Sequence, residues 1–125
     1  MDPRSGKDAA DDALEQLISE LAAVVDELGR ARQRAVELRE QRAQGLDWYS
    51  IVAAEEHPLI VEQVTSAMSS LATVGGRWRR EQAAALAAED VSINRIAALY
   101  GVTRQRVSAL LRGRETDDPE TGTVE

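Results

Sequence analysis

Apolar residues recur at helical spacing through the first third of the chain. From residue 14 to 38 the spacing alternates between three and four residues, as at the a and d positions of a coiled coil. The residues of this seam are Leu14, Leu17, Leu21, Val24, Leu28, Ala31, Ala35 and Leu38. The seam fades where the next two positions are Arg42 and Gly45. We therefore predict one long helix from about Asp8 to Ala43, about 54 Å in length at 1.5 Å per residue.

The apolar stripe of this helix is wider than the seam alone. Ile18 and Val25 lie beside the seam and broaden it. A helix of this length needs a partner helix to bury such a stripe, and the width favours a bundle or an intersubunit four-helix arrangement over a plain parallel coiled coil. We predict that the seam residues form a dimer contact. The alternative is that the long helix folds back on the chain's own middle helices in a monomer.

The middle of the chain, residues 45–76, predicts a helical connector with an apolar face. Asp47 can cap a short helix that runs through Glu56, and Pro58 fits the first turn of the helix that follows. The apolar stripe of that second helix consists of Ile60, Val64, Ala67, Met68, Leu71 and Val74. Gly75-Gly76 is the best candidate for a break, a kink or a domain boundary. A continuous helix is the alternative, because each glycine costs only about 1 kcal/mol relative to alanine.

Residues 92–112 have the pattern of two short helices joined by a tight turn. Ser92 can cap the first helix, and Gly101 supplies the positive φ that ends it at low steric cost. Val102 would fill the space between the helices, and Thr103 would cap the second one. The residues predicted to face inward are Ile96 and Leu99 before the turn and Val107, Leu110 and Leu111 after it. These features together predict a helix-turn-helix.

This segment closely resembles the helix-turn-helix of bacterial transcription regulators and of the C-terminal domains of site-specific recombinases. Their signature is a small residue in the first helix, a glycine four residues later and a β-branched residue six after that; Ala97, Gly101 and Val107 match in place. The resemblance covers residues 77–112, with residues 77–88 as the supporting helix of a three-helix domain. More loosely, the whole chain looks like the small, Ala- and Arg-rich helix-turn-helix proteins of high-GC actinobacteria. The resemblance implies a second helix that enters the major groove of DNA.

The distribution of charge favours the same segment. The whole chain carries a net charge of −7, which is unfavourable for binding a polyanion. Residues 77–114, however, hold eight arginines against three carboxylates, a net charge of +5. The remaining segments carry −4 in residues 1–47, −3 in residues 48–76 and −5 in residues 115–125. The basic surplus therefore coincides with the motif, as expected of an electrostatic contact with DNA.

If the apolar residues of the second helix face inward, its other face is free to contact DNA. The residues expected to contact bases are Arg104, Gln105, Ser108, Ala109 and Arg112. A glutamine can pair with adenine in bidentate fashion and an arginine with guanine, while small side chains let the helix approach the bases. The residues expected to contact phosphates are Thr103, Arg95, Arg106 and Arg114.

Other functions find little support in the sequence. The chain has no cysteine, which excludes disulfides and thiol chemistry. No apolar run approaches the roughly 18 residues of a membrane span, and the start of the chain lacks the apolar stretch of a signal peptide. His57 follows two glutamates and could suggest a metal site. Because it is a single histidine, we favour the interpretation that the cluster forms a helix cap before Pro58. Without a recognisable catalytic constellation, we expect no enzyme, no metal and no cofactor, and a cytoplasmic location at the nucleoid.

Trp78 lies in a run with Arg77, Arg79 and Arg80. Such a run could touch nucleic acid through stacking. We favour the alternative in which Trp78 is a core anchor under the three-helix domain.

These observations predict an all-α protein with four segments. They are a disordered tail (1–7), a helical dimerisation module (8–74), a helix-turn-helix domain (77–114) and an acidic disordered tail (115–125). We expect a homodimeric transcriptional regulator that binds double-stranded DNA, because symmetric DNA sites favour a two-fold protein. The alternatives are an architectural protein of the nucleoid and an adaptor that engages the transcription machinery through its long helix. The sequence identifies no small-molecule effector.

Overall fold

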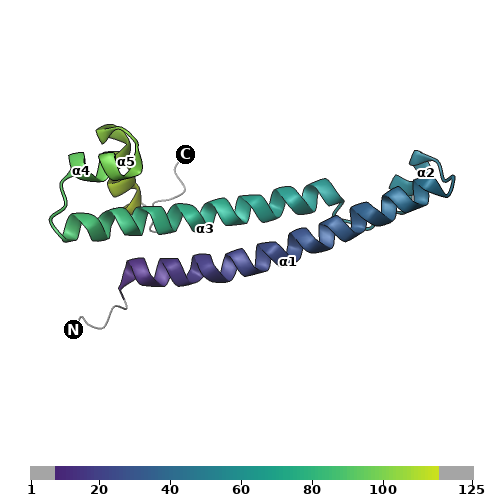
Figure 1. The fold of residues 1–125 in the computed structure, drawn as a ribbon, viewed down its shortest axis with the longest axis horizontal. Helices are drawn as coiled ribbons and strands as arrows, with labels where there is room; N and C mark the ends of the chain where they lie inside the picture. The colour runs from purple at the N-terminus through teal and green to yellow at the C-terminus, as the bar shows by residue number, and fades with distance from the viewer. Residues whose placement is uncertain (1–7, 116–125) are drawn as a thin grey trace. The chain divides into compact units, whose positions relative to one another are not determined.

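The computed structural model describes residues 8–115, and every regular element in this range is helical. The helices are α1 (Ala9–Ala43), α2 (Trp48–Ala54), α3 (Ile60–Ala88), α4 (Ile93–Tyr100) and α5 (Arg104–Glu115), shown in Figure 1. The predicted all-α class is confirmed. The predicted first tail and nearly all of the second lie outside the described residues. Within the described range the chain divides into two compact units, residues 18–72 and residues 8–17 with 73–115.

In the unit of residues 18–72, the long helix folds back on the chain's own middle helices. The α1 part of this unit runs antiparallel to the beginning of α3, and the short helix α2 lies between them in sequence (Figure 1). Ser70 on α3 donates a hydrogen bond to Glu20 on α1, with 2.6 Å between the oxygens. The hydrophobic side chains buried in this unit are those of Val24, Ala31, Ile51 and Ala67.

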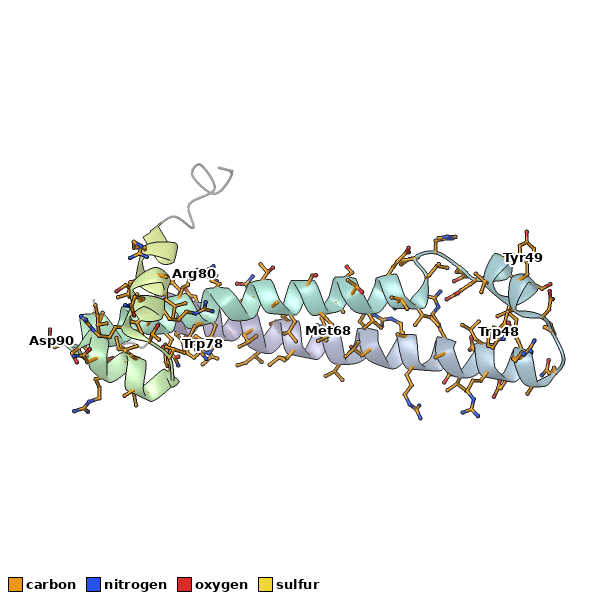
Figure 2. All side chains as sticks on the ribbon, turned by 90° about the horizontal axis from the view of Figure 1, so that it is seen from above. Trp48, Tyr49, Met68, Trp78, Arg80 and Asp90 are labelled. Carbon is orange, nitrogen blue, oxygen red and sulfur yellow. The ribbon has the colours of Figure 1, made fainter. Side chains whose placement is uncertain are left out.

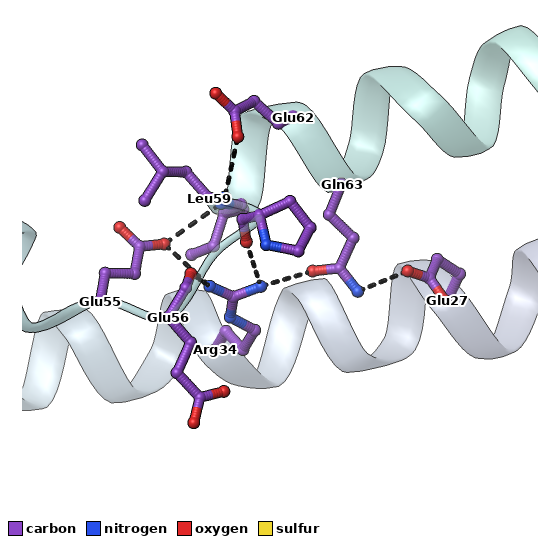
Figure 3. A network of polar contacts seen from close by, with 9 residues as sticks. Glu27, Arg34, Glu55, Glu56, Leu59, Glu62 and Gln63 are labelled. Carbon is purple, nitrogen blue, oxygen red and sulfur yellow. Dashed lines mark hydrogen bonds and ion pairs between the residues drawn. The ribbon is translucent and has the colours of Figure 1, made fainter.

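Arg34 on α1 holds the connector that leads from α2 into α3 (Figure 3). Its guanidinium donates hydrogen bonds to the carbonyl oxygens of Pro58 at 2.9 Å and Glu56 at 2.7 Å. It also donates to the side-chain oxygens of Gln63 at 2.9 Å and Glu55 at 3.3 Å. The contact between Arg34 and Glu55 is an ion pair, and the side chain of Glu55 is only 9% exposed. One side chain of α1 therefore fixes both the backbone of the connector and the first turn of α3.

Glu27 extends this network along α1. Its carboxylate accepts a hydrogen bond of 2.7 Å from the Gln63 amide. Hydrogen bonds from Arg30 and then from Gln63 hold the pKa of Glu27 below its ordinary value. A lowered pKa in the folded state contributes stability above the unfolded-state pKa, and this contribution is lost as the pH falls through the folded-state pKa.

Three details of the middle helices differ from the sequence prediction. Helix α2 ends at Ala54, two residues before the predicted end at Glu56. Asp47 stands at the N-cap of α2, but its side chain makes no cap hydrogen bond. Helix α3 begins at Ile60, so Pro58 precedes the helix instead of occupying its first turn. The first turn of α3 is capped by two carboxylates, because the backbone N–H of Leu59 donates to Glu62 and that of Ile60 donates to Glu55.

Helix α3 passes through Gly75 and Gly76 without a break. The expected break is therefore absent, and the continuous alternative holds. Val74 and Trp78, on either side of the glycines, are both half-buried. Their partial burial contributes a fraction of the roughly 1.5–3 kcal/mol that full burial gives, and this acts against the roughly 1 kcal/mol that each glycine costs.

Candidate nucleic-acid interface

The turn between α4 and α5 is built as its sequence predicts. The Ser92 hydroxyl accepts a hydrogen bond of 3.1 Å from the backbone N–H of Arg95 and so caps α4. Gly101 ends α4 in the left-handed conformation, with φ 70° and ψ 35°. The Thr103 hydroxyl then accepts a hydrogen bond of 3.1 Å from the backbone N–H of Arg106, at the start of α5. The hydroxyl of Ser92 thus begins α4, and Gly101 with the Thr103 hydroxyl defines how α4 leads into α5.

The cap at Ser92 gives a prediction for stability. Ser92→Ala should reduce the free energy of unfolding by about 1 kcal/mol, because the backbone N–H of Arg95 loses its partner. Urea unfolding followed by circular dichroism measures this loss. Ser92→Asp, which keeps an acceptor oxygen at the cap, is the matched control and should stay close to the parent protein. Equal stability of the alanine and aspartate variants would contradict the capping role.

A small apolar core holds α4 and α5 together. Ile96 and Ala97 of α4 and Val107 of α5 are its buried members. The partly buried residues packed around them are Leu86, Val91, Ile93, Tyr100, Val102 and Leu111. The predicted inward positions of Ile96, Val107 and Leu111 are therefore confirmed. The prediction for Leu99 is wrong, since its side chain is 63% exposed, and Tyr100 packs against the core instead.

Tyr100 links α4 to α3. Its hydroxyl donates a hydrogen bond of 2.8 Å to the Gln82 side chain, and the Arg79 guanidinium lies 4.3 Å from the centre of its ring. Burial raises the pKa of Tyr100, and the positive charge of Arg79 acts in the opposite direction. Sequence reasoning missed this residue because Leu99 is the more apolar of the two neighbours. The signal was its spacing of three and four residues from Ala97 and Ile96.

The face of α5 opposite Val107 is open. The exposed residues on and around it are Thr103, Arg104, Gln105, Arg106, Ala109 and Arg112, together with Arg95 on α4, and Ser108 is partly exposed. Arg104, Gln105, Ser108 and Arg112 line one shallow depression of about 250 Å³. Four of the five residues expected to contact bases are thus brought together at one place. The side chain of Arg114, an expected phosphate contact, lies outside the described part of the chain.

The arginines of residues 77–112 fall into two groups. Those of α3 make contacts within the protein: Arg77 donates to Gln16 at 2.7 Å, and Arg79 stacks on Tyr100. Arg80 packs against α5, since a Cβ placed on Gly113 would lie 3.2 Å from its Cδ. The second group is exposed and comes from α4 and α5: Arg95, Arg104, Arg106 and Arg112. Arg104, Arg106 and Arg112 of the second group lie on α5, and two of them, Arg104 and Arg112, line the depression.

Three further findings concern the described residues outside this face. Trp78 is half-buried, but it is not among the residues packed on the core around Ile96 (Figure 2 labels Trp78). Between residues 8 and 115 no group of three or more histidine, cysteine, aspartate or glutamate side chains is placed to hold a metal ion. In the same range, no helix combines the length and the apolar character that crossing a lipid bilayer requires.

The seam residues of α1 have divided surroundings. Val24 and Ala31 are buried within the single chain. Leu14, Leu17, Leu28 and Leu38 are half-buried, whereas Leu21 and Ala35 are exposed. Part of the seam is therefore already in use inside the chain.

Comparison with known proteins gives no relative to set beside this geometry. No protein-family model, no curated protein and no solved structure matches the chain.

Proposed function

We propose that this chain is a sequence-specific DNA-binding transcriptional regulator that acts as a homodimer. In this proposal the end of α3 with α4 and α5 forms a helix-turn-helix, and α5 is the recognition helix. The observation that carries it is the gathering of Arg104, Gln105, Ser108 and Arg112 around one depression on the open face of α5. Two of these side chains are long arginines and one is an amide, the groups that form bidentate pairs with guanine and adenine.

The remaining exposed groups fit contacts with the DNA backbone. Arg95 on α4 and Arg106 on α5 are exposed, do not line the depression, and would pair with phosphates. Thr103 caps α5 through its hydroxyl, so the first turn of α5 would point backbone N–H groups towards a phosphate. Ala109 is small and exposed, which would allow α5 to enter the major groove closely. The nucleoid is the location that this function requires.

Substitutions on α5 separate base recognition from backbone contacts. Arg104→Ala or Gln105→Ala should weaken binding to a preferred site by about 1–3 kcal/mol and relax the discrimination at one position. Arg106→Ala should weaken binding to all sequences alike and lower the slope of log K against log salt by about one. Gel-shift titrations at several salt concentrations, on a selected site and on random duplex, measure both quantities.

Arg30→Ala is the matched control for these variants, because Arg30 lies on α1 in the other compact unit and is 64% exposed. It should leave DNA binding unchanged. If all three α5 variants lose the same affinity on every sequence, base recognition by α5 is excluded. If none of them differs from Arg30→Ala, the proposed function is excluded.

An adaptor function is the second candidate, and one observation favours it. Helix α2 and the residue before its cap expose Leu46 at 41%, Trp48 at 53%, Tyr49 at 81% and Val52 at 50% (Figure 2). Aromatic side chains of this kind are enriched in protein interfaces. Genomic pull-down with sequencing distinguishes the candidates. Sharp palindromic peaks support a regulator, broad coverage supports an architectural protein of the nucleoid, and no enrichment supports the adaptor.

A further inference from the structure

Helix α1 exposes an apolar stripe beside the residues that it packs on α3. In the unit of residues 18–72, Val24 is the buried contact residue of α1, at 5% exposure. Ile18, Leu21 and Val25 lie to one side of it on the helix and are 59%, 45% and 68% exposed. The half-buried Leu28 continues the same stripe.

Helix α3 exposes a matching stripe. Ala67 is its buried contact residue, and Val61 and Met68 lie to one side of it, 74% and 48% exposed. The half-buried Val64 and Leu71 complete this second stripe. Met68 lies in the first third of α3, which begins at Ile60 and ends at Ala88 (Figure 2).

The two stripes lie on the same side of the helix pair. A groove on one side is lined by Glu20 and Glu27 from α1 and by Ser66 and Ser70 from α3. By helical periodicity, the exposed apolar residues of each helix lie on the other side of the buried contact line. They form one surface, which we call the apolar face: Ile18, Leu21, Val25 and Leu28 of α1 with Val61, Val64, Met68 and Leu71 of α3. The face contains no charged residue, whereas the groove on the opposite side includes two glutamates, a glutamine and two serines beside small apolar residues.

The stripes also cover the same length of the helix pair. Hydrogen bonds join Glu20 to Ser70 and Glu27 to Gln63. These bonds place the beginning of the α1 stripe beside the end of the α3 stripe. The apolar face is therefore a compact patch. A second copy of the chain, related by a two-fold axis through the middle of the contact, would place the same patch against it.

We infer that a second copy of this chain covers the apolar face and that the two helix pairs form an intersubunit four-helix bundle. Covering the five most exposed residues would remove roughly 500 Å² from water on each copy, so the contact would bury about 1,000 Å² in total, the lower bound of a specific interface. The half-buried members of the face add to this area. A second copy fits because a two-fold interface needs a patch complementary to itself, and this one is apolar throughout.

The internal core of the unit is too small to replace such a contact. Its buried hydrophobic side chains are those of Val24, Ala31, Ile51 and Ala67, and two of these four are alanines. A second layer of two helices would enclose the apolar face and give the unit a continuous core. The inference deepens the proposed function, because it names the surface that joins the homodimer. The seam residues Val24 and Ala31 serve inside the chain, and the neighbouring stripe serves between chains.

The mass of the full chain in solution tests this inference. Sedimentation velocity should give twice the chain mass for the parent protein at micromolar concentration. Val25→Glu combined with Met68→Glu should give the mass of one chain and raise the dissociation constant at least about 100-fold, because four carboxylates would face one another in the contact. Ser19→Glu combined with Ser69→Glu adds the same charges at exposed positions away from the face and should remain dimeric. Circular dichroism verifies that all variants stay helical.

Crosslinking gives a second, independent measurement. Because the chain has no cysteine, a single cysteine can be linked by a bismaleimide only to another copy. Met68→Cys should yield the two-chain product efficiently, and Ser69→Cys should not. A monomeric parent protein, dimers in both glutamate variants, or equal crosslinking at the two positions would each overturn the inference.

The outcomes separate this inference from the proposed function. A monomeric parent protein that still discriminates DNA sites through Gln105 would refute the inference that a second copy covers the apolar face, and would leave DNA recognition standing. A dimer that behaves as described but ignores duplex DNA would refute DNA recognition alone.

Discussion

Val107→Asp is expected to disrupt the packing of α4 on α5 and to abolish binding to every DNA sequence. Val107 is fully buried and packs with Ile96 and Ala97 in the core of this helix pair. The buried neighbours Ile96 and Ala97 offer a carboxylate no cation or side-chain donor, and the hydroxyl of the partly buried Tyr100 already donates to Gln82, so burial of the carboxylate should cost about 4 kcal/mol or more. Since a cost of this size is a large fraction of the net stability of a small domain, α5 should lose its position on α4.

Ala109→Asp is the matched control for this variant. It adds the same carboxylate two residues further along α5, but Ala109 is exposed. Its effect on the free energy of unfolding should stay within about 0.5 kcal/mol. Hydrogen exchange of the α4 and α5 amides should therefore accelerate in Val107→Asp and remain slow in Ala109→Asp. Protection in both variants would show that Val107 does not hold the two helices together.

Arg34→Met is expected to destabilise the unit of residues 18–72 by about 3 kcal/mol. The substitution preserves much of the side-chain length but removes every donor. Two backbone carbonyls of the connector, the Gln63 amide oxygen and the Glu55 carboxylate would lose their partner. Loss of a partner is costly here because Gln63 and Glu55 are among the least exposed polar side chains of the unit, at 8% and 9%.

Arg30→Met provides the comparison for this prediction. Arg30 lies one helical turn before Arg34, but it is 64% exposed and pairs with Glu27 on its own helix. Its removal should cost no more than about 1 kcal/mol. Urea unfolding of both variants by circular dichroism gives the difference. If the two arginines contribute equally, the connector is not held by Arg34.

Local features of the fold were predictable from the sequence because their causes are local. The left-handed Gly101 and the hydroxyl caps of Ser92 and Thr103 depend on residues within a few positions along the chain. For the same reason, the open face of α5 followed from the inward turn of Val107 and Leu111. Periodicity alone defines such faces when both neighbouring elements are short.

Features that depend on distant residues were not predictable in this way. The hydrogen bonds of Arg34 reach residues that are between 21 and 29 positions away in the sequence, and no rule of helical spacing predicts such contacts. The continuity of α3 through Gly75 and Gly76 depends on burial on both sides of the glycines, which outweighs their low helical propensity. The choice of Tyr100 over Leu99 depends on Gln82 and Arg79 of another helix.

The same difference applies to the long apolar stripe of α1. Its periodicity predicts that a partner helix is needed, and it does not identify the chain from which that helix comes. The stripe is wide enough for two partners, and α3 of the same chain covers the side around Val24. Sequence patterning could not divide the stripe, because both sides satisfy helical spacing equally well.

The two tryptophans lie in different compact units, Trp48 in residues 18–72 and Trp78 in the other. Replacing one of them by phenylalanine would therefore leave a single tryptophan, in one unit only, whose emission can be excited separately from that of Tyr49 and Tyr100. Emission spectra of the two single-tryptophan proteins could follow the melting of each unit separately. Each tryptophan can thus serve as an optical reporter of one unit: Trp48 for the unit proposed to self-associate and Trp78 for the unit proposed to bind DNA.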